Sequence, residues 1–202
     1  MYTICETTIF NKYYSDYWIE EEYDEFKIFI ASNPQADVVE PQTHGLRKIR
    51  WRSKKSGKRS GVRVIYYNRL NNGEIWLLTI YGKGTTEKIN KKPYEYSWRH
   101  SMSHSKNIEE RDAQRNIGEE LLQGIDEMLA ASPTKTHIIT QTDVALARQK
   151  AALTQKQFAQ VLGVSVRTLE SWEQGARKPS KAAQSLIKLF IKDPEFVKEA
   201  LL

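Results

Sequence analysis

The spacing of apolar residues along this 202-residue chain first alternates and then becomes helical. Residues 2–9 alternate between apolar and polar side chains, which predicts a short strand. Apolar residues then recur at helical spacing, which predicts two helices over residues 10–18 and 20–31. The second helix has to end at Asn33-Pro34, because the residue before a proline is pushed out of the helical region of backbone conformation.

Strand-like alternation returns in the next part of the chain, over residues 45–51, 62–68 and 75–81. The last two runs are joined around Asn71-Asn72-Gly73, which is a strong β-hairpin signal. Helices followed by strands favour an α+β domain, which we place at residues 1–92. In such a domain the N-terminal helices should cover one face of an antiparallel sheet and leave the other face free.

The rest of the chain is dominated by helical patterns. Residues 93–107 carry no clear period and are interpreted as a linker. An amphipathic helix is predicted over residues 108–131, with one apolar stripe opposite a face rich in Glu and Arg. A short strand or connector follows at 137–140, and four or five short helices occupy 143–202. We therefore divide this part into a helix and connector at 108–140 and an all-α domain at 141–202.

Composition narrows the class of protein. Hydrophobic residues make up 40% and charged residues 28% of the chain, as in ordinary globular proteins. No apolar run approaches the roughly 20 residues that cross a bilayer, and the N-terminus lacks signal-peptide features, so we expect a cytoplasmic protein without membrane contact. The single Cys5 is expected to be a buried apolar residue. The histidines lack metal-ligand spacing, which predicts neither a metal site nor another cofactor. They are His44, His100, His104 and His137.

The net charge of +6 is unevenly distributed along the chain. Counted as Lys and Arg minus Asp and Glu, it is −7 over residues 1–40, +12 over 41–100, −4 over 101–145 and +5 over 146–202. Two basic stretches, each preceded by an acidic one, indicate two modules that bind polyanions. Nucleic acid is the first partner to consider.

The most specific motif lies at residues 153–173. Thr154 and Gln157 have the spacing of a capping box that starts a helix, and Ser165 can cap the next helix. Gly163 stands between them, where a tight turn between two crossed helices needs a left-handed residue. These features resemble the Xre-type, lambda-repressor-like helix-turn-helix family over about residues 140–195.

The resemblance implies that the second helix of the motif enters the major groove of DNA. Arg167 is the best candidate base reader, because its guanidinium can contact guanine. Lesser base contacts are expected from Val166, Thr168 and Ser171. Phosphate contacts are expected from Gln155, Arg177 and Lys178. The alternative is a helix-turn-helix retained for protein contacts only, with Arg167 solvated.

In the basic stretch of the first domain, an alternation typical of β-strands lies within a run of Lys and Arg. Lys48, Arg50 and Arg52 should share one face of a strand, with Ile49 and Trp51 on the other. Arg63, Ile65 and Tyr67 should share one side of the next strand. The result is a cationic groove over a sheet. Together with residues 77–83, this stretch resembles the RelE-like toxin superfamily, and its HigB branch most closely, over about residues 1–92.

That family implies a ribosome-dependent endoribonuclease that cuts messenger RNA without a metal. The 2′-hydroxyl of the RNA attacks the adjacent phosphate, so the protein has to stabilise negative charge and move protons. Arg50 and Arg63 would stabilise charge, Lys48 would stabilise charge or transfer a proton, and Tyr67 and Lys83 would act as acid or base. RNA-binding residues would be Arg47, Lys54, Lys55, Lys58 and Arg59. Some relatives carry Arg and Tyr where this chain has Gly84 and Asn90, changes that the HigB branch tolerates. A basic sheet without catalysis is the alternative, because the sequence after Asn90 lacks the helical pattern of the C-terminal helix that closes the site in many relatives.

A toxin followed by an Xre-type antitoxin predicts a fused type II toxin–antitoxin protein. Its partners would be operator DNA, the ribosome and messenger RNA, and it would form a homodimer through the antitoxin part. The amphipathic helix would lie on the toxin in an intramolecular contact, with its acidic side chains near the basic groove, or would dimerise through the same stripe. Two other functions are possible. One is a DNA-binding regulator with an inactive toxin fold, and the other is an RNA-binding adaptor.

Overall fold

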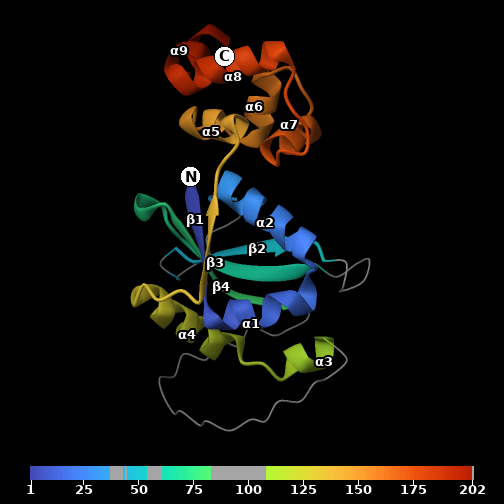
Figure 1. The fold of residues 1–202 in the computed structure, drawn as a ribbon, viewed down its shortest axis with the longest axis vertical. Coiled ribbons are helices and arrows are strands. Elements are labelled where there is room, and N and C mark those ends of the chain that lie inside the picture. Colours follow the sequence, from blue (N-terminus) through green and yellow to red (C-terminus); the bar gives the residue numbers. More distant parts are fainter. Residues whose placement is uncertain (37–42, 44, 54–60, 83–107, 202) are drawn as a thin grey trace. The chain divides into compact units, whose positions relative to one another are not determined.

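The computed structural model describes residues 1–36, 43, 45–53, 61–82 and 108–201, and it divides into two compact units (Figure 1). The sheet unit comprises Thr3–Tyr23 and Gln35–His137. The helical unit comprises Met1–Tyr2, Asp24–Pro34 and Ile138–Leu202. The linker predicted at 93–107 lies outside the described residues. In the described ranges, no helix has both the length and the apolar character needed to span a membrane.

Five strands form one sheet in the order β2-β3-β4-β1-β5. Their bounds are β1 Tyr2–Glu6, β2 Arg47–Trp51, β3 Val62–Arg69, β4 Glu74–Gly82 and β5 Lys135–Ile139. β2, β3 and β4 are antiparallel neighbours, as predicted, but β1 pairs with β4 in parallel, so the expectation of a wholly antiparallel sheet is wrong. The physical reason is the connection between β1 and β4, which contains two helices and is long enough for the crossover that a parallel pair needs.

The predicted hairpin between β3 and β4 is confirmed. Its turn is a short 3₁₀ segment, Leu70–Asn72, followed by Gly73 in the left-handed conformation with φ of 68°. Glycine adopts this conformation without steric cost, which is why the Asn-Asn-Gly sequence marked the turn.

The N-terminal helices are α1 (Thr8–Tyr17) and α2 (Glu20–Ser32). Thr7 caps α1 by accepting a hydrogen bond from the amide of Phe10, and α1 packs against β4. Phe10, Trp18 and Tyr23 form an aromatic cluster with ring centroids 5.8 to 6.4 Å apart. Cys5 is buried as expected, and burial raises the pKa of its thiol to about 11.

The helix predicted over 108–131 is two helices, α3 (Ile108–Ala113) and α4 (Ile117–Leu129). Asn116 separates them, because its side chain caps α4 by accepting a hydrogen bond from the amide of Glu119. α4 packs against β4, and Gly124 permits the close approach: a Cβ there would lie 3.2 Å from the carbonyl oxygen of Leu78. The sheet face that we expected to be free is therefore covered where α4 packs on β4.

The helical unit contains five helices after residue 140. They are α5 (Asp143–Lys150), α6 (Gln155–Val161), α7 (Val166–Glu173), α8 (Lys181–Lys192) and α9 (Pro194–Leu201). The capping box of Thr154 with Gln157 is present, Ser165 caps α7, and Gly163 has φ of 66° in the turn between α6 and α7. Phe158, Leu169, Trp172, Ile187 and Phe190 share the core of these helices.

A substitution in the turn after α5 should stabilise the helical unit. Ala152 is exposed and has φ of 54°, a conformation that costs about 1–2 kcal/mol for a residue with a Cβ. Ala152→Gly removes this strain, so we expect the midpoint of thermal unfolding to rise. The matched control is Ala182→Gly in the first turn of α8, which should not raise the midpoint, because Ala182 has no left-handed strain to relieve. A lower midpoint for Ala152→Gly would contradict the prediction.

Candidate nucleic-acid interfaces

Helix α7 turns one face inward and leaves the other exposed. Leu169, Trp172 and Glu173 are buried, at positions that recur with helical spacing. Val166 and Arg167 lie at the start of the helix and are exposed. The predicted base readers Thr168 and Ser171 are half-buried, and the Thr168 hydroxyl lies 2.8 Å from that of Ser165. The N-terminal end of α7 therefore presents Val166 and Arg167, two of the four predicted base readers, on an open surface.

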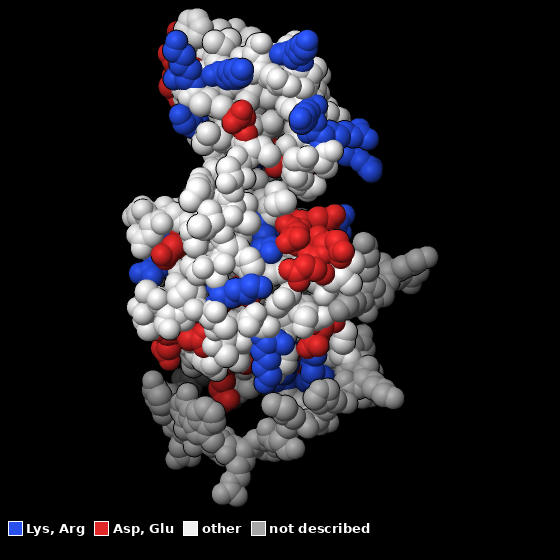
Figure 2. All heavy atoms as spheres, viewed as in Figure 1, with Lys and Arg blue, Asp and Glu red and all other residues white. Residues whose placement is uncertain are grey.

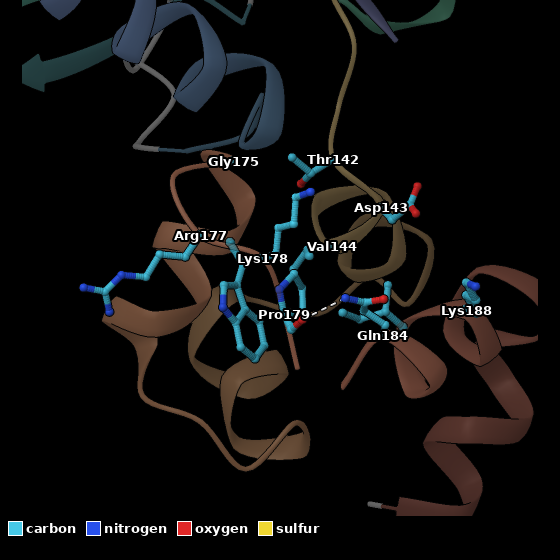
Figure 3. A pocket seen from close by; sticks show the side chains of 11 residues that line it. Thr142, Asp143, Val144, Gly175, Arg177, Lys178, Pro179, Gln184 and Lys188 are labelled. Atoms are coloured by element: carbon cyan, nitrogen blue, oxygen red, sulfur yellow. Dashed lines mark hydrogen bonds between the residues drawn. The ribbon is translucent and has the colours of Figure 1, made fainter. Parts of the chain in front are cut away.

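Arg177 and Lys178 follow α7 and are exposed. They lie on the border of a pocket of about 290 Å³ whose apolar lining includes Trp172 and Ile187 (Figure 3). Lys188 also lines this pocket. In Figure 2 several Lys and Arg side chains gather on the side of the helical unit where α7 lies. This positive surface suits contacts with the phosphates of a duplex.

The side chain of Gln155, which we expected to contact a phosphate, is hydrogen-bonded to another side chain of the protein. Its amide nitrogen donates to Oε2 of Glu173 at 2.7 Å, and Oε1 of the same carboxylate accepts from Nε of Arg148 at 2.5 Å. Arg148 and Glu173 are both buried. Sequence patterns gave no sign of this ion pair, since no short-range spacing connects residues on two different helices.

The comparison with protein families agrees with this geometry. Residues 139–188 match the family model described as helix-turn-helix. This part of the chain is therefore similar to helix-turn-helix domains. The match runs from the end of β5 into α8, so it includes α6, the turn at Gly163 and α7. It supports a DNA-binding transcriptional regulator function for the C-terminal part of the protein.

The second candidate interface is the basic pair of strands in the sheet unit. β2 and β3 place Arg50 directly opposite Arg63, and Lys48 opposite Ile65. Arg50 is exposed, and Lys48 and Arg63 are half-buried. Like charges directly opposite each other on neighbouring strands are destabilising. A bound anion would relieve this repulsion, so Arg50 and Arg63 stay candidates for anion binding.

The other residues predicted for the toxin-like site are placed only in part. Tyr67 is half-buried and packs beside the core cluster that contains Ile65 and Trp76. Arg47 donates from Nη1 to the carbonyl oxygen of Gln35 at 3.2 Å. Several predicted residues lie outside the described ranges, namely Lys54, Lys55, Lys58, Arg59 and Lys83, together with His44, His100 and His104.

Helix α4 packs on the sheet face that carries the side chains of Arg63 and Tyr67. Its buried residues Ile117, Leu121 and Met128 share one core cluster with strand residues of that face, including Ile65. Ile65 lies two positions from both Arg63 and Tyr67 on β3, so the three side chains share a face. The carboxylate of Glu120, which we expected near the basic groove, instead pairs with Arg115 at 2.6 Å.

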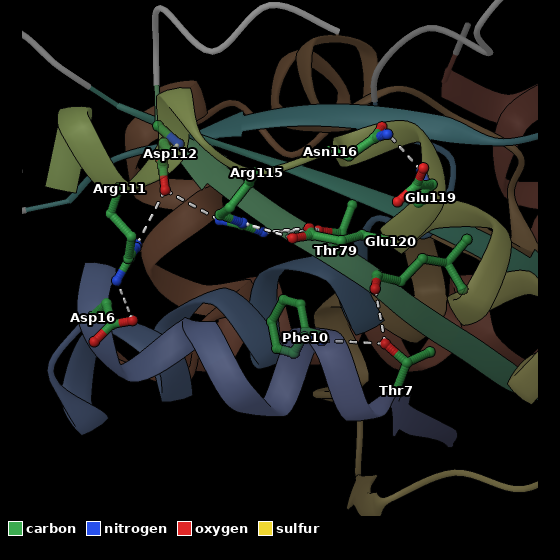
Figure 4. Close-up of polar contacts among 12 residues, drawn as sticks. Thr7, Phe10, Asp16, Thr79, Arg111, Asp112, Arg115, Asn116, Glu119 and Glu120 are labelled. Carbon is green, nitrogen blue, oxygen red and sulfur yellow. Dashed lines mark hydrogen bonds and ion pairs between the residues drawn. The ribbon is translucent and has the colours of Figure 1, made fainter. Parts of the chain in front are cut away.

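A buried polar network joins α3 and the turn before α4 to α1 and β4 (Figure 4). Asp112 is 2% exposed; its carboxylate accepts hydrogen bonds from the hydroxyl of Tyr17 at 2.5 Å and from the amide of Gly82 at 2.7 Å. Nη1 of Arg115 lies 3.2 Å from Asp112 and 2.9 Å from the Tyr17 hydroxyl. Arg111 pairs with Asp112 and Asp16. Sequence patterns gave no sign of this network.

His137 lies in β5, within the segment for which we expected a short strand or connector, and it contacts a buried carboxylate. Its Nε2 pairs with Oε1 of Glu6, which also accepts a hydrogen bond from the hydroxyl of Tyr23 at 2.5 Å. The amide of Thr134 donates to the carbonyl oxygen of Glu6 at 2.8 Å. These contacts hold β5 beside β1, so the segment after α4 extends the sheet.

Two buried tyrosines predict how stability depends on alkaline pH. Burial raises the pKa of Tyr17 and of Tyr23 well above the usual value of 10.0. The hydrogen bonds of the two phenols to Asp112 and Glu6 act in the same direction. In the unfolded chain both phenols ionise near pH 10, whereas the folded state keeps them neutral.

The stabilisation that these two neutral phenols contribute is therefore complete below about pH 10. It is lost as the pH rises from their pKa in the unfolded chain towards their raised pKa in the folded state. We expect the free energy of unfolding, measured in urea, to fall steeply above pH 10 and to fall less steeply in Tyr17→Phe. Tyrosinate absorbance should show that at least Tyr17 and Tyr23 ionise late, only as the protein unfolds. Ionisation of every phenol near pH 10 in the folded protein would contradict this prediction.

Proposed function

We propose that the protein is a fused type II toxin–antitoxin protein: a DNA-binding regulator joined to a ribosome-dependent messenger RNA endonuclease that is held inactive in the same chain. The regulator part rests on the helix-turn-helix match and on the exposed start of α7. In this proposal Arg167 reads a base, and Arg177 and Lys178 contact phosphates. Binding as a homodimer to a palindromic operator would repress transcription.

The nuclease part rests on the resemblance to the RelE and HigB toxins and on the opposed Arg50 and Arg63. In the proposed reaction the 2′-hydroxyl oxygen of the RNA forms a bond to the adjacent phosphorus, and the bond to the 5′-oxygen breaks. Arg50 and Arg63 would stabilise the extra negative charge. Lys48 and Tyr67 are the described candidates for transferring the proton from the 2′-hydroxyl and the proton to the leaving oxygen.

The observation that carries the inhibition is the packing of α4 on the sheet face of Arg63 and Tyr67. A tethered segment has an effective concentration of roughly millimolar for a short flexible linker, so this contact would be occupied most of the time. The apolar stripe that we considered for dimerisation is partly used in this packing. Leu122 and Leu129 of α4 remain 62% and 70% exposed.

A regulator with an inactive toxin fold is the second candidate, and it is favoured by the burial of α4 residues Ile117, Leu121 and Met128 in the core of the sheet unit, as in a permanent part of the fold. The DNA-binding part is common to both candidates and is tested first. The full chain is incubated with a pool of randomised duplexes, and bound DNA is sequenced after repeated selection. We expect enrichment of a palindromic sequence, and repression of a reporter that carries it. Failure to enrich any sequence would contradict operator binding.

A further inference from the structure

The C-terminal end of α2 contacts the helix-turn-helix within the helical unit. The last carbonyl groups of a helix have no partner inside the helix. Here side chains of the C-terminal region donate to them: Gln141 Nε2 to Ala31 O at 2.8 Å, and Gln149 Nε2 to Ser32 O at 2.7 Å. Ala31 and Ser32 are both buried. The N-terminal part of the chain thus completes its helix with donors from the DNA-binding part.

Arg148 joins the same end of α2 to the helix that carries the base readers. Its Nη2 donates to Ser32 O at 2.9 Å and to Oδ1 of Asn33 at 2.7 Å. Its Nε donates to Oε1 of Glu173, the last residue of α7. The other oxygen of that carboxylate accepts the amide of Gln155, the first residue of α6. A continuous chain of hydrogen bonds therefore runs from α2 through Arg148 to α7 and α6.

The planar guanidinium of Arg148 couples the hydrogen bonds on its different edges. Its N–H groups form a rigid planar fork, so acceptors on one edge fix the direction of the donors on the others. Arg148 is 7% exposed, and a buried cation that loses an acceptor has to rearrange or bind water. The negative end of the α2 dipole adds to the attraction. Asn33 and the carbonyls before it therefore fix how Arg148 meets Glu173.

We propose that Asn33 and the C-terminal carbonyls of α2 are positioning elements of the DNA-binding surface, acting through Arg148 and Glu173 on the relative placement of α6 and α7. The first part of the chain then contributes to sequence-specific DNA binding without touching DNA. This inference rests on the proposed operator binding. It assigns a role in DNA recognition to residues that lie more than 100 positions before the helix-turn-helix match.

The test compares Asn33→Ala with Asn33→Asp in the full chain. Both substitutions remove the hydrogen bond from Nδ2 of Asn33 to Phe29 O, 3.1 Å long, but only aspartate keeps an acceptor for Arg148. The probe is the duplex that the unsubstituted chain selects from the randomised pool, with a scrambled duplex beside it. Ser185→Ala is the control, because Ser185 is exposed and bonds only within α8, to Lys181 O.

We expect Asn33→Ala to lose about tenfold in affinity for the selected duplex, a typical effect of one hydrogen bond to a charged group. Its affinity for the scrambled duplex should stay within about twofold of the unsubstituted chain, because non-specific binding depends on charge. Asn33→Asp and Ser185→Ala should keep the unsubstituted affinities. An equal loss in both Asn33 variants, an equal loss on both duplexes, or no loss in Asn33→Ala would overturn the inference.

A second measurement separates this inference from the proposed function. Amide chemical shifts of the full chain are compared between Asn33→Ala and Asn33→Asp. The inference predicts changes at Gln155 and Glu173 in the alanine variant, whether or not any duplex is selected. If no duplex is selected, operator binding is contradicted. The chemical-shift changes at Gln155 and Glu173 still test whether Asn33 is coupled to α6 and α7. Changes confined to α2 and α5 would contradict this coupling.

Discussion

Replacing Asp112 by alanine should destabilise the sheet unit by about 3–5 kcal/mol, which is the usual cost of removing one partner of a buried ion pair. The carboxylate of Asp112 holds the hydroxyl of Tyr17, the amide of Gly82 and the guanidinium of Arg115. The side chain of Arg115 is only 5% exposed, so the substitution would leave a buried cation with fewer acceptors. The loss of stability should come mainly from weaker packing of α3 and α4 on the sheet.

Urea unfolding of the full chain measures this loss. Asp126→Ala is the matched control, since Asp126 lies on the exposed side of α4 and its removal should change stability by less than about 0.5 kcal/mol. Hydrogen exchange should also increase in α3 and α4 of Asp112→Ala before it increases in β3. A loss of less than about 1 kcal/mol would show that the network does not hold the segment on the sheet.

Replacing Arg167 by alanine should cost about 1–3 kcal/mol of affinity for the selected duplex, or roughly 5- to 150-fold. Arg167 is exposed at the start of α7, and none of the packing of the helix-turn-helix depends on it. Stability should therefore not change. The binding of a scrambled duplex should weaken much less, by about the contribution of one positive charge.

Titration of the two duplexes at a fixed salt concentration measures this effect. Arg167→Lys keeps the charge but loses the planar fork that can bind guanine in a bidentate manner, so it should restore binding to the scrambled duplex only. Full recovery of the selected duplex by lysine would show that Arg167 contacts phosphate instead of a base.

The sequence predicted the local elements well because their signals are local. The capping box at Thr154, the cap at Ser165 and the left-handed Gly163 each determine backbone conformation within a few residues, and the structure confirms all three. The alternation of β2 and β3 also assigned Arg50 and Arg63 to one face of their own strands, and the register, which alternation does not determine, places them opposite each other. The roles assigned to these arginines remain predictions.

Long-range features could not be predicted in this way. Asp112 meets Tyr17, and Arg148 meets Glu173, only after the chain has folded, and no periodicity connects such residues. The parallel pairing of β1 with β4 depends on the whole connection between them. The helix pattern over 108–131 likewise gave the apolar stripe but not the cap at Asn116 that divides it, since a single polar residue fits either a helix interior or a cap.

The most direct test of the proposed function is cleavage of messenger RNA on ribosomes by residues 1–92 expressed alone, beside the full chain and an Arg63→Ala version of the fragment. A folding check by circular dichroism accompanies each protein. The account predicts cleavage and growth arrest by the fragment, and neither by the full chain or by Arg63→Ala. A folded fragment that cleaves no messenger would contradict the silenced nuclease and leave a DNA-binding regulator that carries an inactive fold.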